Sequence, residues 1–415
     1  MKKYIRTILV MTLGLLSMTN SLWAADNEKH WSTHFAYNSV QQIALDDHSV
    51  YAVANGKLFS IHQLSEQVTL YNNFSGMHGT DIAQIAYDSV RDQKLLIYTN
   101  GKIDLWTSQG QMRYVPDLYN KQMTESKMCN NITIHDSTAY LSMDFGILTF
   151  DLNKHEIVDT YYIGDQAQAI KVLDVMIQGD MLYAQTEAGT MAANIHDNVV
   201  DYRYWHPVTG ISFDANKGRE YVASNGDVWK VAGTRGVERK QATGALTYYL
   251  PDGPLVNTPY AMTAQGGRVF VVAGGRWVNQ NRTPGDLMIW HNEKWHNTTS
   301  SQLQAANGKK PVLDFTSVAV DPNDPTHYFI ASYGTGLFEF RGDQLYKNYK
   351  PSNSIIAAAA PDNPDRYTRT DALAWDADGC LWVCVAGGVD TSLVCILPDG
   401  TQRGLNLYPN GDKLS

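Results

Sequence analysis

A hairpin pattern that recurs at intervals of 37 to 45 residues constrains the fold of this 415-residue chain more than any other feature. In each copy an apolar run is followed by a turn that contains glycine, often Asn-Gly, and then by a second apolar run. Asn-Gly suits a two-residue hairpin turn because both residues accept a positive φ angle. The turn glycines are Gly56, Gly101, Gly146, Gly189 and Gly226. Their spacing is the length of one four-stranded β-propeller blade.

Three further units follow in the second half of the chain. The sixth lies between residues 260 and 296, and the eighth lies between 372 and 397. The seventh, 314–349, is the clearest copy, with four short β-rich runs separated by tight turns. We therefore predict an all-β fold: a seven-bladed β-propeller of four-stranded antiparallel blades, followed by the start of a second propeller.

The predicted domains are a signal peptide at 1–25, an N-terminal β-propeller at 26–350, a linker at 351–370 and the first blade of an incomplete second propeller at 371–415. The start of the linker is rich in Pro, Asn and Ala, which fits a linker or a long loop between blades. Two alternatives stay open: a second propeller that begins near Pro251, or a first ring completed by strands that follow this sequence. A lone blade with one bare apolar face is unstable, so we expect the sequence to be part of a longer protein.

The N-terminus has the features of a secretory signal. Lys2, Lys3 and Arg6 precede an apolar run, and small residues near Ala24 suit cleavage. The apolar run is too short for a stable membrane anchor, and no second hydrophobic stretch approaches membrane length. We expect an exported protein with no transmembrane segment after removal of the signal.

Composition and motifs argue against several classes of function. The net charge is −9, and no basic run offers the cationic patch that nucleic acid needs. The 24 Tyr and 10 Trp residues suit β-sheet surfaces and also sugar-binding surfaces. The sequence contains no nucleophile elbow, P-loop or His-Glu-x-x-His motif. We predict no catalytic residue, no metal and no cofactor.

The four cysteines leave two interpretations open. In an exported protein, Cys384 and Cys395 can form a disulfide, because they lie on two runs joined by a tight turn. Free thiols fit equally well, since sequence does not fix the strand register. Cys380 and Cys384 lack the spacing of a CxxC metal or redox motif.

A polar insertion in the sixth unit, residues 274–285, is the best candidate for recognition. Insertions in repeat proteins form loops on one face, which is often the binding face. Arginine and tryptophan on an exposed loop can stack on sugars and bind phosphate or carboxylate. The alternative is that this loop packs its tryptophan against its own blade. The candidate ligand-binding residues are Arg276, Trp277, Asn279, Arg282, Trp290 and Trp295.

Several blade sequences resemble the N-terminal propeller of PorZ-like proteins of the type IX secretion system. The resemblance covers residues 31–205 well and the remainder more loosely. Part of it is shared with the propellers of two-component regulators. The segments that carry it are Trp31 to Gly76, with Val50-Tyr-Ala-Val-Ala54 and Gly56-Lys-Leu-Phe-Ser60, then Gly101-Lys-Ile-Asp-Leu105, Asp117-Leu-Tyr119, Phe145-Gly-Ile147 and Asp159-Thr-Tyr-Tyr-Ile-Gly164.

The resemblance implies a noncatalytic protein of the outer-membrane attachment complex at the cell surface. Such proteins work with PorU-, PorV- and PorQ-like partners to attach secreted cargo to anionic lipopolysaccharide. The resemblance therefore implies recognition of lipopolysaccharide or another glycan by a propeller face. The alternative that it leaves open is the periplasmic, oligosaccharide-sensing propeller region of a hybrid two-component regulator.

Overall fold

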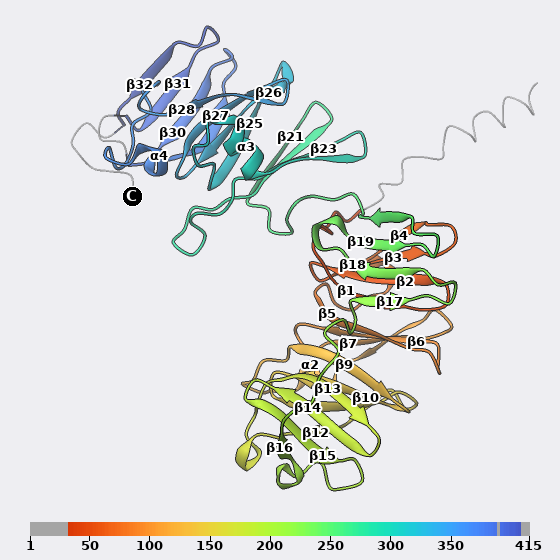
Figure 1. Cartoon of the computed structure of the whole chain (residues 1–415). Coiled ribbons are helices and arrows are strands. Elements are labelled where there is room, and N and C mark those ends of the chain that lie inside the picture. Colours follow the sequence, from red (N-terminus) through yellow and green to blue (C-terminus); the bar gives the residue numbers. More distant parts are fainter. Residues whose placement is uncertain (1–31, 388–390, 408–415) are drawn as a thin grey trace, which may run out of the picture. The chain divides into compact units, whose positions relative to one another are not determined.

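The computed structural model describes residues 32–387 and 391–407 as eight four-stranded antiparallel sheets (Figure 1). The predicted signal peptide lies outside the described residues. The predicted all-β fold and its count of eight four-stranded units are confirmed. Within each sheet the strands pair in chain order, so every sheet is a meander of the kind that forms a propeller blade.

The first five sheets span residues 40–249. Sheet 1 contains β1 (Val40–Leu45), β2 (Ser49–Ala54), β3 (Lys57–His62) and β4 (Val68–Tyr71). Sheet 2 contains β5 (Ile82–Asp88), β6 (Gln93–Tyr98), β7 (Ile103–Trp106) and β8 (Met112–Val115). Sheet 3 contains β9 (Cys129–His135), β10 (Thr138–Met143), β11 (Gly146–Asp151) and β12 (Glu156–Tyr161). Sheet 4 contains β13 (Val172–Gln178), β14 (Met181–Thr186), β15 (Gly189–Asn194) and β16 (His206–Val208), and sheet 5 contains β17 (Glu220–Val222), β18 (Val228–Val231), β19 (Val237–Lys240) and β20 (Leu246–Tyr249).

The last three sheets span residues 261–405. Sheet 6 contains β21 (Ala261–Gln265), β22 (Arg268–Val272), β23 (Leu287–His291) and β24 (Lys294–Thr298). Sheet 7 contains β25 (Phe315–Asp321), β26 (Asp324–Ser332), β27 (Gly336–Arg341) and β28 (Gln344–Tyr349). Sheet 8 contains β29 (Thr370–Trp375), β30 (Leu381–Val385), β31 (Leu393–Ile396) and β32 (Gln402–Leu405). Short helices lie in the connections: α2 (Asp117–Asn120), α3 (Ser300–Ala306), α4 (Pro364–Tyr367) and the 3-10 turns η1 (Asn73–Ser75), η2 (Asp165–Ala167), η3 (Tyr202–Tyr204) and η4 (Gly233–Arg235).

The recurring turn glycines have two physical causes. At Asn55-Gly56 both residues have positive φ, 48° and 75°, as a two-residue hairpin turn requires. At Gly146 the limit is space, because a Cβ there would lie 2.2 Å from the Tyr161 carbonyl oxygen. The second constraint recurs in sheet 7, where a Cβ on Gly336 would lie 2.4 Å from the Tyr349 carbonyl oxygen.

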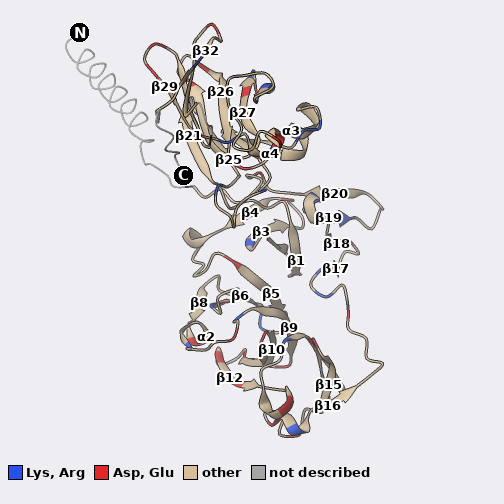
Figure 2. Ribbon diagram, turned by 90° about the vertical axis from the view of Figure 1, so that its left-hand side faces the viewer, with Lys and Arg blue, Asp and Glu red and all other residues tan. Residues whose placement is uncertain are grey.

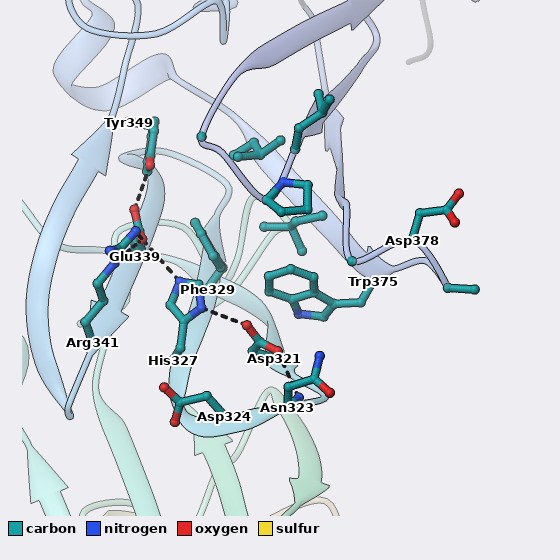
Figure 3. Close-up of a pocket in the computed structure, with 17 residues that line it drawn as sticks. Asp321, Asn323, Asp324, His327, Phe329, Glu339, Arg341, Tyr349, Trp375 and Asp378 are labelled. Carbon is teal, nitrogen blue, oxygen red and sulfur yellow. Dashed lines mark hydrogen bonds and ion pairs between the residues drawn. The ribbon is translucent and has the colours of Figure 1, made fainter.

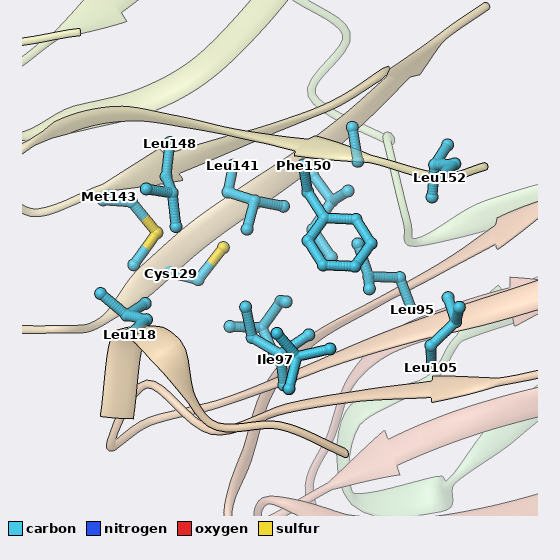
Figure 4. Close-up of a cluster of buried hydrophobic side chains, with 14 of the residues drawn as sticks. Leu95, Ile97, Leu105, Leu118, Cys129, Leu141, Met143, Leu148, Phe150 and Leu152 are labelled. Carbon is cyan, nitrogen blue, oxygen red and sulfur yellow. The ribbon is translucent and has the colours of Figure 1, made fainter. Parts of the chain in front are cut away.

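Adjacent sheets share apolar cores that neither could form alone. Between sheets 2 and 3, side chains such as Leu95, Ile97, Leu141 and Phe150 are withdrawn from solvent, and Leu118 of α2 closes one end (Figure 4). The positions of Lys, Arg, Asp and Glu residues are scattered along the ribbon (Figure 2). Burial of these apolar side chains between the sheets is therefore the main source of stability.

The order in which the sheets pack differs from their order in the chain. Sheets 4, 3, 2 and 1 are consecutive neighbours through their first strands, and sheet 5 then packs against sheet 1. The Ile43 N–H donates to the Gly218 carbonyl at 2.7 Å, and Trp229 of sheet 5 is buried with Ile43 and Phe59 of sheet 1. In the segment that connects sheet 4 to sheet 5, the Lys217 ammonium group forms an ion pair with the Asp174 carboxylate at 2.6 Å.

Sheets 6, 7 and 8 form a second run of neighbours. One buried cluster joins sheets 6 and 7, and another joins sheets 7 and 8. The predicted linker 351–370 takes part in this packing: Ile356 is fully buried, and Thr368 forms a β-bridge with Thr335. We propose that this segment is a long loop between blades, which is one of the two interpretations that its composition allows.

This packing bears on the predicted domain boundary. In a ring of seven consecutive blades, the fifth blade would contact the fourth and the sixth rather than the first. Contact between sheets 5 and 1 therefore favours the alternative in which a second propeller begins near Pro251. The boundary stays a prediction, and we propose the division near Pro251 in place of the one at residue 350.

Candidate ligand-binding cavity

The polar insertion of sheet 6 reaches across to the neighbouring sheet. It connects β22 to β23, as predicted. Its later part is fixed to the segment that precedes β25, because the Thr283 N–H donates to Asp314 Oδ1 at 2.8 Å and the Asp314 N–H donates to the Thr283 carbonyl at 2.9 Å. Pro284 also forms a β-bridge with Leu313. These bonds attach the loop to sheet 7.

Guanidinium groups and aromatic rings alternate beside this loop. The Arg276 guanidinium lies 5.2 Å from the Trp277 ring and 5.1 Å from the Tyr333 ring. The Arg369 guanidinium lies 5.0 Å from the same Tyr333 ring and 5.6 Å from the Tyr367 ring. Stacking on a ring leaves the edge of a guanidinium open to hydrogen-bond acceptors.

These side chains line a cavity of about 350 Å³. Four arginines and a single carboxylate, Asp314, contribute to its wall, so its charge is positive. The lining residues are Gly275, Arg276, Trp277, Val278, Asn281, Arg282, Leu313, Asp314, Tyr333, Gly334, Thr335, Arg366, Tyr367 and Arg369. The arrangement is suited to an anionic ligand that also presents a flat or apolar face.

The arginines of the cavity differ in whether they form ion pairs with carboxylates of the protein. Arg276 forms an ion pair with Asp371, at 2.8 Å between Nη1 and Oδ2. Among the ion pairs that join described residues, none involves Arg282, Arg366 or Arg369. Among the described residues, three of the four arginines thus have no carboxylate within ion-pair distance.

The predicted site residues fall into two groups. Arg276, Trp277 and Arg282 line the cavity, and Trp277 remains 62% exposed, so it does not pack into its own sheet. Asn279 belongs to the same loop but is not a lining residue. Trp290 and Trp295 pair across the β23–β24 hairpin, at the end of β23 remote from the loop. The structure therefore does not bring them to the cavity.

Sequence reasoning missed half of this cavity. Tyr333 belongs to the turn between β26 and β27, and Arg366, Tyr367 and Arg369 belong to the segment predicted as a linker. The available signal was the cluster Arg366-Tyr-Thr-Arg369, which is unusual for a linker. Only the packing of this segment on sheet 7 brings it near the insertion.

A larger groove of about 560 Å³ lies between sheets 7 and 8 (Figure 3). At its base the Glu339 carboxylate, 1% exposed, accepts hydrogen bonds from Arg341 Nε at 2.7 Å and the Tyr349 hydroxyl at 2.6 Å. The His327 ring lies between two carboxylates, with Nε2 3.2 Å from Glu339 and Nδ1 3.0 Å from Asp321. Trp375 of sheet 8 covers this ring edge-on. Within the groove, His327, Glu339 and their partners Asp321, Arg341 and Tyr349 are thus bound to one another.

The four cysteines are free thiols in the structure, which is one of the two interpretations that the sequence leaves open for Cys384 and Cys395. Cys384 lies opposite Leu393, and Cys395 lies opposite Trp382. Cys384 is exposed, whereas Cys129 is fully buried and its pKa is raised by burial.

We expect thiol alkylation of the native protein to distinguish these positions. Iodoacetamide at pH 8 should label Cys384 first and should label Cys129 only after unfolding, because a buried, protonated thiol is a poor nucleophile. Peptide mass spectrometry of timed samples measures both rates. A native protein in which Cys384 resists the reagent until a reductant is added would instead support the Cys384–Cys395 disulfide.

Part of the region that forms the first five sheets matches a known protein family. Residues 50–206 match the family model of the type IX secretion system PorZ N-terminal β-propeller domain. The predicted resemblance to PorZ-like proteins is confirmed. A search of curated proteins gave no match.

The solved structure of PorZ shares the fold. That protein is described as an essential bacterial surface component of the type IX secretion system of Porphyromonas gingivalis, and its TM-score is 0.79 at 21% identity. The match covers 93% of this chain and 61% of the PorZ chain, so this chain spans less than two thirds of that structure. The extracellular domain of the hybrid two-component system BT4673 of B. thetaiotaomicron gives a TM-score of 0.34 and 12% identity, over 92% of this chain and 56% of that one.

Two further observations concern membranes and metals. Within the ranges that the structure describes, no helix is long and apolar enough to cross a membrane. Over the same residues, no group of three His, Cys, Asp or Glu side chains is arranged to hold a metal ion.

Proposed function

We propose that this chain is a noncatalytic β-propeller component of a type IX secretion system, exported to the cell surface. In this proposal it works in the outer-membrane attachment complex with PorU-, PorV- and PorQ-like proteins and helps to attach secreted cargo to anionic lipopolysaccharide. The observation that carries the proposal is the match of residues 50–206 to the PorZ N-terminal propeller domain. The positively charged cavity beside the insertion supports binding of an anionic glycan.

The larger groove supports a noncatalytic role. A general base needs a ring nitrogen or carboxylate oxygen that can reach a substrate. His327 instead has both nitrogens beside carboxylates, and Glu339 already accepts from Arg341 and Tyr349. This network joins the strands of sheet 7, and Trp375 of sheet 8 packs on its His327 ring.

Chemical cross-linking of intact cells tests the proposal. We expect the chain to be recovered from the outer-membrane fraction together with PorU-, PorV- and PorQ-like proteins, and its deletion to leave cargo released into the medium. A tagged, unrelated exported protein serves as the control. Recovery in the periplasm without these partners, or degradation of lipopolysaccharide by the purified protein at ordinary turnover, would contradict it.

A further inference from the structure

The cavity beside the insertion contains arginines suited to an anionic group and a carboxyl oxygen suited to a hydroxyl group. Its lining includes Arg282, Arg366 and Arg369, which form no ion pair among the described residues. Arginine presents two parallel N–H donors, a geometry that matches a carboxylate or phosphate group. A ligand with an anionic group would replace the missing carboxylate partners.

The aromatic residues hold the guanidinium groups in place. The Tyr333 ring lies 5.1 Å from the Arg276 guanidinium and 5.0 Å from that of Arg369, and the Tyr367 ring also contacts Arg369. Trp277 and Tyr367 are also 62% and 38% exposed, so part of each side chain remains open to a ligand. The C–H faces of a sugar ring stack well on such surfaces.

Asp314 is the residue suited to accept a hydrogen bond from an uncharged hydroxyl group of the ligand. Its side chain is 7% exposed, and burial raises the pKa of its carboxyl group. The carboxyl group accepts hydrogen bonds from the backbone N–H groups of Arg282 and Thr283, the latter on Oδ1, whereas Oδ2 lies beside Gly334. A Cβ on Gly334 would come within 3.2 Å of Oδ2, so a side chain at position 334 would crowd this oxygen.

We propose that this cavity binds one acidic saccharide unit: Arg282, Arg366 and Arg369 hold its anionic group, Asp314 Oδ2 accepts from one of its hydroxyls, and Trp277 stacks on its ring. The proposal rests on the proposed function, because it names the part of an anionic glycan that this protein recognises. It makes Asp314 the residue that distinguishes an acidic sugar from a simple anion.

Calorimetric titration with four probes tests the charge and the sugar separately. The probes are glucose 6-phosphate, glucuronate, glucose and inorganic phosphate. We expect wild-type protein to bind at least one of the two acidic sugars, and to bind it roughly tenfold or more tightly than either glucose or inorganic phosphate, since each charge-assisted hydrogen bond contributes strongly in a partly closed site. The preferred acidic sugar then identifies the anionic group. Equal binding of inorganic phosphate and both acidic sugars would overturn the proposal, because it would show attraction to charge alone.

Variants locate the two parts of the site. The double substitution Arg366→Gln and Arg369→Gln should weaken the acidic sugar at least tenfold, whereas the exposed Arg403→Gln should leave it unchanged. Asp314→Asn should reduce the preference for the acidic sugar over inorganic phosphate. Gly334→Ala, which adds a methyl group beside Oδ2 without changing charge, should do the same if Asp314→Asn does not fold. Unchanged binding in the double variant would exclude this site.

The outcomes separate this inference from the proposed function. Normal cross-linking to PorU-like partners in a strain that carries the double arginine variant, together with undiminished lipopolysaccharide binding, would reject the cavity and leave the function standing. Loss of the partners in wild-type cells, with acidic sugar still bound at the cavity, would reject the secretion role alone.

Discussion

Glu339→Gln should lower the free energy of unfolding of sheets 7 and 8 by about 3 kcal/mol, because breaking a buried charge pair leaves its partners unsatisfied. The carboxylate is buried and receives hydrogen bonds from Arg341 Nε and the Tyr349 hydroxyl, and it lies 3.2 Å from His327. A glutamine keeps one acceptor oxygen but presents an N–H₂ group to the remaining donors. Urea denaturation followed by tryptophan fluorescence measures the loss.

The loss should depend on pH in a defined direction. Burial alone would raise the pKa of Glu339, but hydrogen bonds from His327, Tyr349 and Arg341 outweigh it and lower the pKa below 4.5. This contribution is present above pH 4.5 and is lost as the pH falls through the lower folded value. The hydrogen bond to Glu339 raises the pKa of His327 above 6.5, so its contribution is complete below 6.5 and is lost as the pH rises through the folded value.

The two windows overlap between pH 4.5 and 6.5. Wild type and Glu339→Gln should therefore differ most near pH 5.5 and less at pH 8. The matched control is Glu156→Gln, whose partner Lys154 lies 3.8 Å away with both side chains largely exposed. It should change stability by less than about 0.5 kcal/mol. A difference that is the same at pH 5.5 and pH 8 would contradict the role of His327.

Local geometry explains why so much of the fold was predictable. A two-residue turn needs positive φ, so Asn55-Gly56 marks a hairpin wherever such a pair follows an apolar run. Strand lengths and the position of the insertion between β22 and β23 follow from the same short-range pattern. Each of these features depends on residues that are close in the sequence.

The features that could not be predicted depend on which sheets touch. The contact of Trp229 with sheet 1 joins residues that are far apart in the chain. The sequences of sheets 1 and 5 are both ordinary blade sequences, so neither one indicates this contact. The cavity likewise needs Arg369 beside Tyr333, which follows only when segment 351–369 packs on sheet 7. Glu339 lies on the same face of β27 as Leu337, which packs against sheet 8. Periodicity within a strand does not specify what covers its face.

Two core substitutions should distinguish the domain divisions. Phe150 is fully buried between sheets 2 and 3, and Phe340 is 1% exposed between sheets 6 and 7, stacked on Tyr328 at 4.9 Å (Figure 4 shows the first core). Replacing either with alanine should cost about 3–5 kcal/mol through lost burial and a residual cavity. Amide hydrogen exchange of each variant shows which strands lose protection as a result of this lost stability.

The pattern of hydrogen exchange distinguishes a domain boundary near Pro251 from one at residue 350. A cooperative unit loses protection throughout when its core is damaged, whereas a separate unit does not. With a division near Pro251, Phe150→Ala should speed exchange in β6 and β10 and leave β26 and β27 unchanged, and Phe340→Ala should do the reverse. The conservative Val318→Ala, in the second core, should speed exchange only in the same strands as Phe340→Ala, and less strongly. If Phe150→Ala instead weakened protection in β26 and β27 as much as in β10, residues 26–350 would unfold as one propeller and the division near Pro251 would be wrong.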